Sequence, residues 1–236
     1  MVLTYFDKGA CQVVFEGDSE NYIYKLPIKS NYFNNKFEII LKYRSILKLF
    51  DRNSTSFEEH LFENSISILK TLEKQTNYSL CQFFPKTTII KTNKIKLLIG
   101  GKEFLYTGDL IKQEKVDIFY KNNTPLNSFN WQDIVDIELE LWKYGVGLGA
   151  SAETWGPKNW GKLRDKTTKL VDTSHLTTNL EEVSSRLSDE VIEFRRKQLL
   201  THYCINSKEL VNQYLHFMRT FLNTNKLKEY WRSNLQ

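Results

Sequence analysis

Residues 156–174, GPKNWGKLRDKTTKLVDTS, are the most informative stretch of this 236-residue chain. The stretch begins with a loop containing Gly156 and Pro157, and a short strand over 168–172 ends on Asp172. Asp172 follows Asn159 by 13 residues. The stretch therefore predicts a loop followed by a strand, with the polar side chain of Asn159 near its beginning and that of Asp172 near its end.

The second half of the chain around this stretch has the pattern of helices. Residues 131–142 are apolar on nearly all sides and predict a buried helix. Gly145, Gly147 and Gly149 follow it, and we interpret them as a flexible cap at its C-terminal end. Two amphipathic segments, 180–201 and 207–231, predict the helices that close the chain.

The first half has the pattern of short strands with a helix between them. Ser56, with Glu59 three residues later, forms a capping box and predicts a helix start, and residues 34–50 also approximate a helical period. The predicted strands are residues 2–6, 11–17, 21–27, 87–92, 95–101 and 104–111. We therefore predict an α+β protein with parts 1–115 and 116–236, and a hinge at the charged segment 112–117.

Composition excludes several classes of protein. Hydrophobic residues make up 41% of the chain and aromatic residues 14%, which supports a real core and excludes collagen, coiled coil and disorder. No apolar window is long enough for a membrane span, and the first residues lack the pattern of a signal peptide. Three cysteines and four histidines fit neither a disulfide framework nor a zinc site. We expect a cytoplasmic protein without a membrane partner.

The positive charge is concentrated at the C-terminal end. The whole chain carries +5, whereas residues 195–236 alone carry +6. This segment predicts either a solvated basic helix face or a surface for an acidic protein partner. Nucleic acid is not favoured, because Tyr214, Phe217 and Phe221 fall at helical spacing and are expected in the core.

Three features in a fixed order carry a resemblance to a known family. Gly9 lies in a turn before Val14, and Lys25 ends the third predicted strand; GPKN follows at 156–159 and VDTS at 171–174. Together they resemble the protein-kinase-like superfamily, with its G-x-G-x-x-G-x-V loop, strand lysine, H-R-D-x-K-P-x-N loop and D-F-G segment. Lys25 by itself also fits a solvated lysine on an edge strand.

This resemblance implies a two-lobed fold, with an antiparallel-sheet N-lobe carrying inserted helices over 1–115 and a short helical C-lobe over 116–236. It also implies ATP and Mg²⁺ as ligands. In this arrangement Gly9 and Val14 cover the nucleotide, Lys25 pairs with its phosphates, and the metal ligands are Asn159 and Asp172. The position of the glutamate that pairs with the lysine is Ser65, so Glu63 or Glu59 would have to replace it.

The departures from the family pattern leave two functions open. Thr154 occupies the position of the catalytic aspartate, and a threonine hydroxyl is not a general base near neutral pH. Glu153 or Asp172 would then orient the acceptor. The second half is too short for a peptide-docking platform, as in the compact bacterial small-molecule and PhoP-regulatory kinase-like proteins. We expect a phosphotransferase with a non-peptide or unusual acceptor, or a pseudokinase that acts as an interaction or regulatory module.

Overall fold

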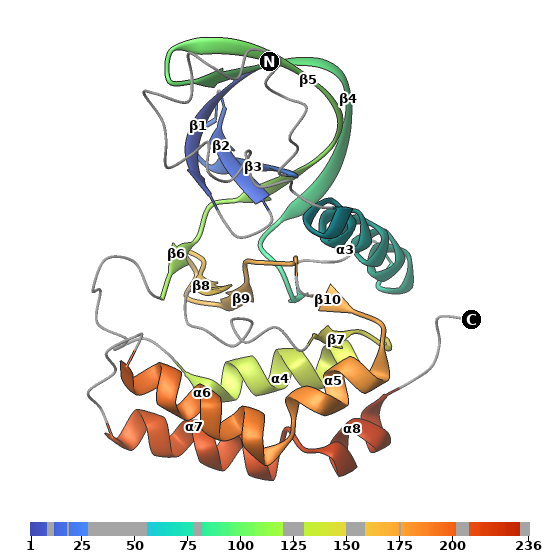
Figure 1. Cartoon of the computed structure of the whole chain (residues 1–236), viewed down its shortest axis with the longest axis vertical. Coiled ribbons are helices and arrows are strands. Elements are labelled where there is room, and N and C mark those ends of the chain that lie inside the picture. The colour runs from blue at the N-terminus through green and yellow to red at the C-terminus, as the bar shows by residue number, and fades with distance from the viewer. Residues whose placement is uncertain are drawn as a thin grey trace. The chain divides into compact units, whose positions relative to one another are not determined.

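The computed structural model describes most of the chain and has an α+β architecture (Figure 1). It divides into two compact units, Met1–Ser67 with Lys86–Lys115, and Ile68–Pro85 with Val116–Gln236. The helix expected over 34–50 lies outside the described residues. These are 1–8, 12–17, 19–27, 56–77, 82–119, 130–149, 159–174, 176–201 and 208–231.

Five strands of the first unit close into a barrel, which Figure 1 shows curling round on itself. Neighbouring strands are antiparallel except β1 and β4, whose parallel pairing sets Val2 opposite Lys96 and closes the barrel. The barrel order is β1 (Val2–Lys8), β2 (Gln12–Glu16), β3 (Tyr22–Pro27), β5 (Lys102–Glu114) and β4 (Thr87–Ile99).

The β4–β5 hairpin differs from the predicted pattern of shorter strands. Residues 87–92 and 95–101 were expected as two strands, but β4 is continuous and has a register shift between Thr92 and Ile95. This bulge explains the error, because it interrupts the alternation of side chains without ending the strand. Gly100 and Gly101 both have positive φ, as a tight turn between such strands requires.

Alternate residues of the strands fill the barrel. In β3, Tyr24 and Leu26 belong to the core, so the intervening Lys25 points to the other face of the sheet. The hydrophobic core of the barrel contains Leu3, Val13, Phe15, Tyr24, Leu26, Ile95, Leu97, Ile99, Tyr106 and Leu110.

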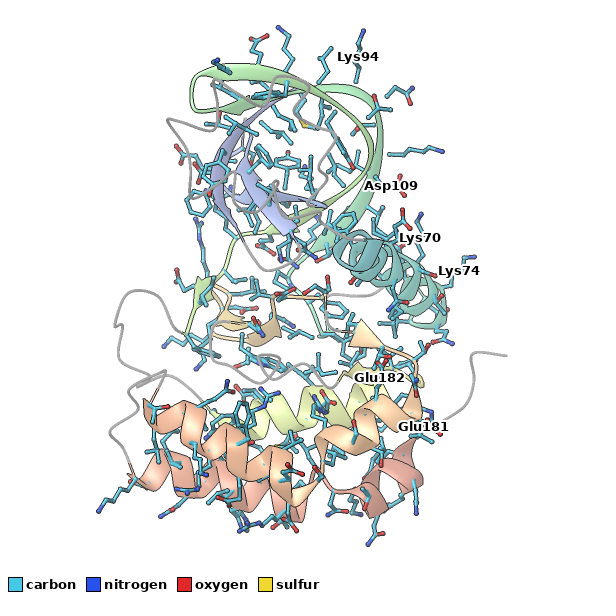
Figure 2. All side chains as sticks on the ribbon, in the orientation of Figure 1. Lys70, Lys74, Lys94, Asp109, Glu181 and Glu182 are labelled. Atoms are coloured by element: carbon cyan, nitrogen blue, oxygen red, sulfur yellow. The ribbon has the colours of Figure 1, made fainter. Side chains whose placement is uncertain are left out.

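Helix α3 (Ser56–Gln75) connects β3 to β4 and begins at the predicted cap residue. Its buried apolar residues recur at helical spacing and include Phe62, Ile66, Leu69 and Leu72. Lys70 and Lys74 lie one turn apart on its exposed side (Figure 2). The apolar stripe of α3 thus faces protein while its lysines face solvent.

The second unit combines small sheets with helices. Strands β6 (Asp117–Ile118), β8 (Trp160–Lys162) and β9 (Thr168–Leu170) form one sheet, and β7 (Gly147–Leu148) pairs with β10 (Leu176–Thr177) in another. The helices are α4 (Trp131–Trp142), α5 (Leu180–Arg186), α6 (Asp189–Thr201), α7 (Lys208–Thr220) and α8 (Thr224–Tyr230). Within the described ranges, no helix has the length and apolar character needed to cross a membrane.

Local capping decides where these helices end. Gly145 takes a φ of 66° after α4, and the Val146 N–H donates to the Leu141 carbonyl, which fits the predicted glycine cap. The segment 180–201, expected as one helix, is divided between α5 and α6. Ser188 is the reason, because its hydroxyl accepts from the Val191 N–H and its carbonyl accepts from the Ile192 N–H, so it starts a new helix.

Candidate functional site

The β8–β9 hairpin brings Asn159 and Asp172 close together in the second unit. Trp160 pairs with Leu170 in the antiparallel register, and the Val171 N–H donates to the Asn159 carbonyl at 2.7 Å. The two candidate metal ligands are therefore attached to directly hydrogen-bonded backbone segments, although 13 residues separate them in sequence.

A tight turn at the tip holds the hairpin together. Asp165 accepts from the N–H and the hydroxyl of Thr167, at 2.9 and 2.7 Å. These bonds, the hydroxyl bond foremost, hold the pKa of the Asp165 carboxyl below its usual value. Lys166 accommodates the turn with a φ of 69°. The tip therefore contributes an ordered closure of the hairpin.

Asp172 also acts as a turn residue. Its Oδ1 accepts from the Ser174 N–H at 2.9 Å, and its side chain is half-buried. Asn159 is 4% exposed. This hydrogen bond to the backbone two residues on is the usual one for an aspartate in a turn, and it orients one carboxylate oxygen.

Other parts of the second unit hold the hairpin in place. The Leu170 N–H donates to the Phe83 carbonyl at 3.0 Å, and the Lys169 ammonium contacts the Gln82 carbonyl at 3.4 Å. The Thr168 hydroxyl hydrogen-bonds the carboxylate of Asp133 on α4. Strand β9 is therefore attached to α4 and to the 82–83 segment.

Lys25 lies in the first unit on an interior strand. Strand β3 pairs with β2 and β5, which sets Lys25 opposite Val14 on one side and Ile111 on the other. Its side chain is only 4% exposed. The alternative of a solvated lysine on an edge strand is therefore wrong, since β3 has neighbours on both sides and Lys25 is buried.

The remaining predicted residues fall into two groups. Glu63 is exposed on α3, whereas Ser65 is fully buried, so Glu63 points to solvent and not into the buried surroundings of Lys25. Gly9, Glu153 and Thr154, and the side chain of Glu59, lie outside the described residues. Glu63 as the partner of Lys25 is not supported by this placement.

The side chains of Asn159 and Asp172 carry oxygen atoms of the kinds that Mg²⁺ accepts as ligands. Mg²⁺ prefers oxygen ligands and is held in proteins by one or two carboxylates together with substrate phosphates and waters. Asp172 supplies a carboxylate and Asn159 an amide oxygen. In the part of the chain that the structure describes, no group of three or more histidine, cysteine, aspartate and glutamate residues could hold a metal ion.

Sequence reasoning missed a buried ion pair that joins α4 to α5. Glu138 and Arg186 are 0% and 1% exposed, and an Arg186 guanidinium N–H donates to Glu138 Oε1. The same oxygen accepts from Trp142 Nε1 at 2.9 Å and from the Leu148 N–H at 3.3 Å. The available signal was an acidic residue within a helix that is otherwise apolar on the same side.

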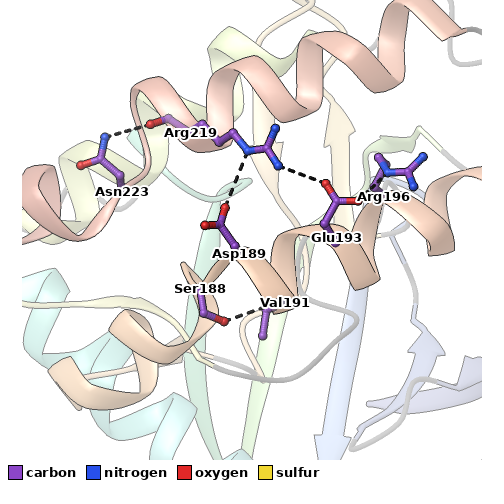
Figure 3. A network of polar contacts seen from close by, with 7 residues as sticks. All are labelled: Ser188, Asp189, Val191, Glu193, Arg196, Arg219 and Asn223. Atoms are coloured by element: carbon purple, nitrogen blue, oxygen red, sulfur yellow. Dashed lines mark hydrogen bonds and ion pairs between the residues drawn. The ribbon is translucent and has the colours of Figure 1, made fainter.

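Part of the positive charge on the basic C-terminal helices is paired with acidic residues of the same helices. Arg219 contacts Asp189 at 3.7 Å and Glu193 at 3.1 Å, and Arg196 contacts Glu193 at 2.7 Å (Figure 3). These contacts, the hydrogen bond from Arg196 foremost, hold the pKa of Glu193 below its usual value. Lys226 pairs with Glu229 at 2.7 Å. The helices therefore present less free positive charge than their sequence suggests.

Other cations of these helices are either buried in the core or exposed. Arg195 is 4% exposed, so it is a core residue and not part of a basic surface. Lys197, Lys208 and Lys228 are exposed and lie outside the ion pairs described above.

In comparisons with known proteins, neither a protein-family model nor a curated protein sequence matches this chain.

Proposed function

We propose that this chain binds ATP with Mg²⁺ as a two-lobed, kinase-like protein. The observation that carries the proposal is the hairpin that juxtaposes Asn159 and Asp172. A second feature supports it: Lys25 is on the third strand, and α3 follows in the connection to the fourth. Protein kinases carry their phosphate-pairing lysine on the third strand and the partner glutamate on the following helix.

The chemistry of the three side chains suits a metal–nucleotide complex. Asn159 and Asp172 would supply oxygen ligands to Mg²⁺, while the Lys25 ammonium would neutralise phosphate oxygens. An ammonium in buried surroundings attracts phosphate more strongly than an exposed one, because the effective dielectric constant is lower. Val14, directly opposite Lys25 in β2, would cover the nucleotide.

The proposal includes two forms that differ in phosphoryl transfer. In the first, the chain transfers phosphate to a non-peptide acceptor that Glu153 or Asp172 orients. In the second, it is a pseudokinase, because Thr154 replaces the aspartate that accepts the acceptor proton. Transfer depends mainly on positioning and charge, so losing this base lowers the rate without excluding the reaction. Measuring ATP turnover of the purified chain separates the two forms.

Nucleotide binding is tested by thermal shift and titration calorimetry with Mg²⁺–ATP. Asp172→Asn removes the charge but keeps an oxygen that accepts from the Ser174 N–H, and Lys25→Met keeps the length of a buried side chain. At 100 times the dissociation constant, binding stabilises the native state by about 2.7 kcal/mol. We expect this stabilisation in the wild type and its loss in both variants.

Matched controls separate the site from general effects of charge removal. Asp165→Asn changes the other aspartate of the same hairpin, and Lys112→Met changes a half-exposed lysine of the neighbouring strand β5. Both are expected to bind as the wild type does. Absence of binding in a folded wild type, or full binding by Asp172→Asn, would rule out this assignment.

The exposed lysines of the C-terminal helices support a second candidate function, recognition of an acidic protein partner. Lys197, Lys208 and Lys228 are on α6, α7 and α8. Replacing all three by glutamate is expected to abolish co-purification of such a partner without changing Mg²⁺–ATP binding. Retention of the partner by the triple variant would exclude this surface.

A further inference from the structure

Glu138 connects three elements of the second unit through one carboxylate oxygen. Its Oε1 accepts from Trp142 on its own helix α4, from the Leu148 N–H of β7 and from Arg186 of α5. Three donors at one buried acceptor fix its position more tightly than packing alone. The distance between α4 and β7 is therefore set by this group.

The contact at β7 extends to Asp172. Leu148 pairs with Leu176 of β10, and the Leu176 N–H donates to the Thr173 carbonyl at 3.2 Å. Thr173 directly follows Asp172 in the chain. A shift of β7 relative to α4 would consequently move β10 and the turn that orients the Asp172 carboxylate.

Close packing around Gly147 prevents β7 from moving nearer to α4 and α5. A Cβ atom at Gly147 would lie 2.8 Å from Val183 of α5 and 3.1 Å from Trp142 Nε1. These are two of the elements that Glu138 joins. The close approach of the glycine and the hydrogen bonds of the carboxylate therefore fix the same strand.

Stability alone does not explain why an ion pair occupies this position. Replacing a buried pair by apolar side chains of similar size is often neutral or stabilising, so such a pair is weak evidence for a stabilising role. A carboxylate that gathers donors from three elements, in contrast, defines their relative positions. Apolar side chains would fill the same space without doing so.

We propose that Glu138, held by Arg186, is a positioning residue that orients the Asp172 carboxylate for metal–nucleotide binding. The proposal rests on the proposed function for its effect on Mg²⁺–ATP. It also predicts a geometric effect that is independent of nucleotide: without Glu138, β7, β10 and the Asp172 turn are held less firmly.

The test uses the full-length chain with Glu138→Met and Arg186→Met combined, so that no unpaired charge is left buried. Glu140→Gln is the control, because it changes a half-exposed carboxylate on the same helix. The affinity for ATP is measured with Mg²⁺ and with chelator. We expect the double variant to lose about tenfold in affinity only in the presence of Mg²⁺, as is typical when the support of a metal ligand is removed.

Amide hydrogen exchange provides the second readout. We expect faster exchange in the double variant at Leu148, Ser174 and Leu176, with unchanged exchange at Thr167 in the hairpin tip. A folded double variant with the affinity and the exchange rates of the wild type would overturn the proposal. If the wild type itself does not bind Mg²⁺–ATP, the proposed function fails. The exchange rates of the double variant then test the positioning role by themselves: rates equal to those of the wild type overturn it, and faster rates support it.

Discussion

The Glu138–Arg186 pair also makes a quantitative prediction about stability. Both side chains are essentially inaccessible to solvent, so removing either one leaves an opposite charge buried without compensation. We expect Glu138→Met and Arg186→Met each to lower the free energy of unfolding by about 3–5 kcal/mol. Burial lowers the pKa of Arg186, and the charge of Glu138 opposes this shift.

The double variant is expected to be less damaged than the sum of the two single changes. It removes both charges, and the remaining cost comes from Trp142 Nε1 and the Leu148 N–H, which lose an acceptor. Each such group costs about 1–3 kcal/mol when buried without a partner. We therefore expect a total loss of about 2–6 kcal/mol, against about 6–10 kcal/mol for the two single changes added together, and so a coupling free energy of about 4 kcal/mol.

Urea denaturation followed by tryptophan fluorescence measures these values. The five tryptophans, at positions 131, 142, 155, 160 and 231, all lie in the second unit, so the signal reports that unit specifically. Glu140→Gln should change stability little, because its carboxylate is half-exposed. Additive losses in the double variant would refute the reasoning, since they would mean that Glu138 and Arg186 do not compensate each other.

Three further changes test other parts of the second unit. Arg219→Gln should lower the melting temperature slightly at pH 7. The pKa of Glu193 is lowered in the folded protein, so this difference in melting temperature should disappear as the pH falls through that pKa and Glu193 becomes protonated. A pH series of melting curves measures the difference. Tyr214→Phe should raise stability by about 1 kcal/mol in urea titrations, since its buried hydroxyl has no hydrogen-bond partner among the described residues, and a loss instead would reveal one. Gly147→Ala should cost about 1–3 kcal/mol by overpacking against Val183, and an unchanged midpoint would contradict this.

Local features of the fold could be predicted because they depend on neighbouring residues. Ser56 with its capping-box partner predicted the first residue of α3, and the glycine after α4 predicted its end. The strand β9 could be found in the same way, from its short apolar run, whereas Asn159 and Asp172 were singled out by the resemblance to kinase-like motifs. All of these signals lie within a few residues of the structure that they determine.

Closure of the barrel could not be predicted in the same way. It depends on the parallel pairing of Val2 with Lys96, and the periodicity of neither strand specifies a partner so distant in sequence. The bulge after Thr92 misled the prediction for a related reason, since a local change of alternation resembles the end of a strand. Long-range pairing therefore determined what the local pattern left open.

The basic helices show how a count of charges overstates a surface. Arg195 lies between Ile192 and Leu199 on the buried side of α6, at helical spacing, so the sequence contained the signal that it faces the core. Arg219, in contrast, is neutralised by acidic residues that precede the basic segment in the chain. Only the folded arrangement of α6 and α7 brings these charges together.

The two forms of the proposed function place different demands on the same residues. Binding of Mg²⁺–ATP needs oxygen ligands at Asn159 and Asp172 and a cation at Lys25, and it does not need a base. Transfer needs in addition a group that accepts the proton of the acceptor, and Thr154 does not provide one. A chain that binds Mg²⁺–ATP but turns it over slowly would use the nucleotide to stabilise one arrangement of its residues. In that case we expect the lysines at positions 197, 208 and 228 to bind the partner. A partner that prefers the nucleotide-bound state must bind more tightly when ATP is present, and ATP must bind more tightly when the partner is present.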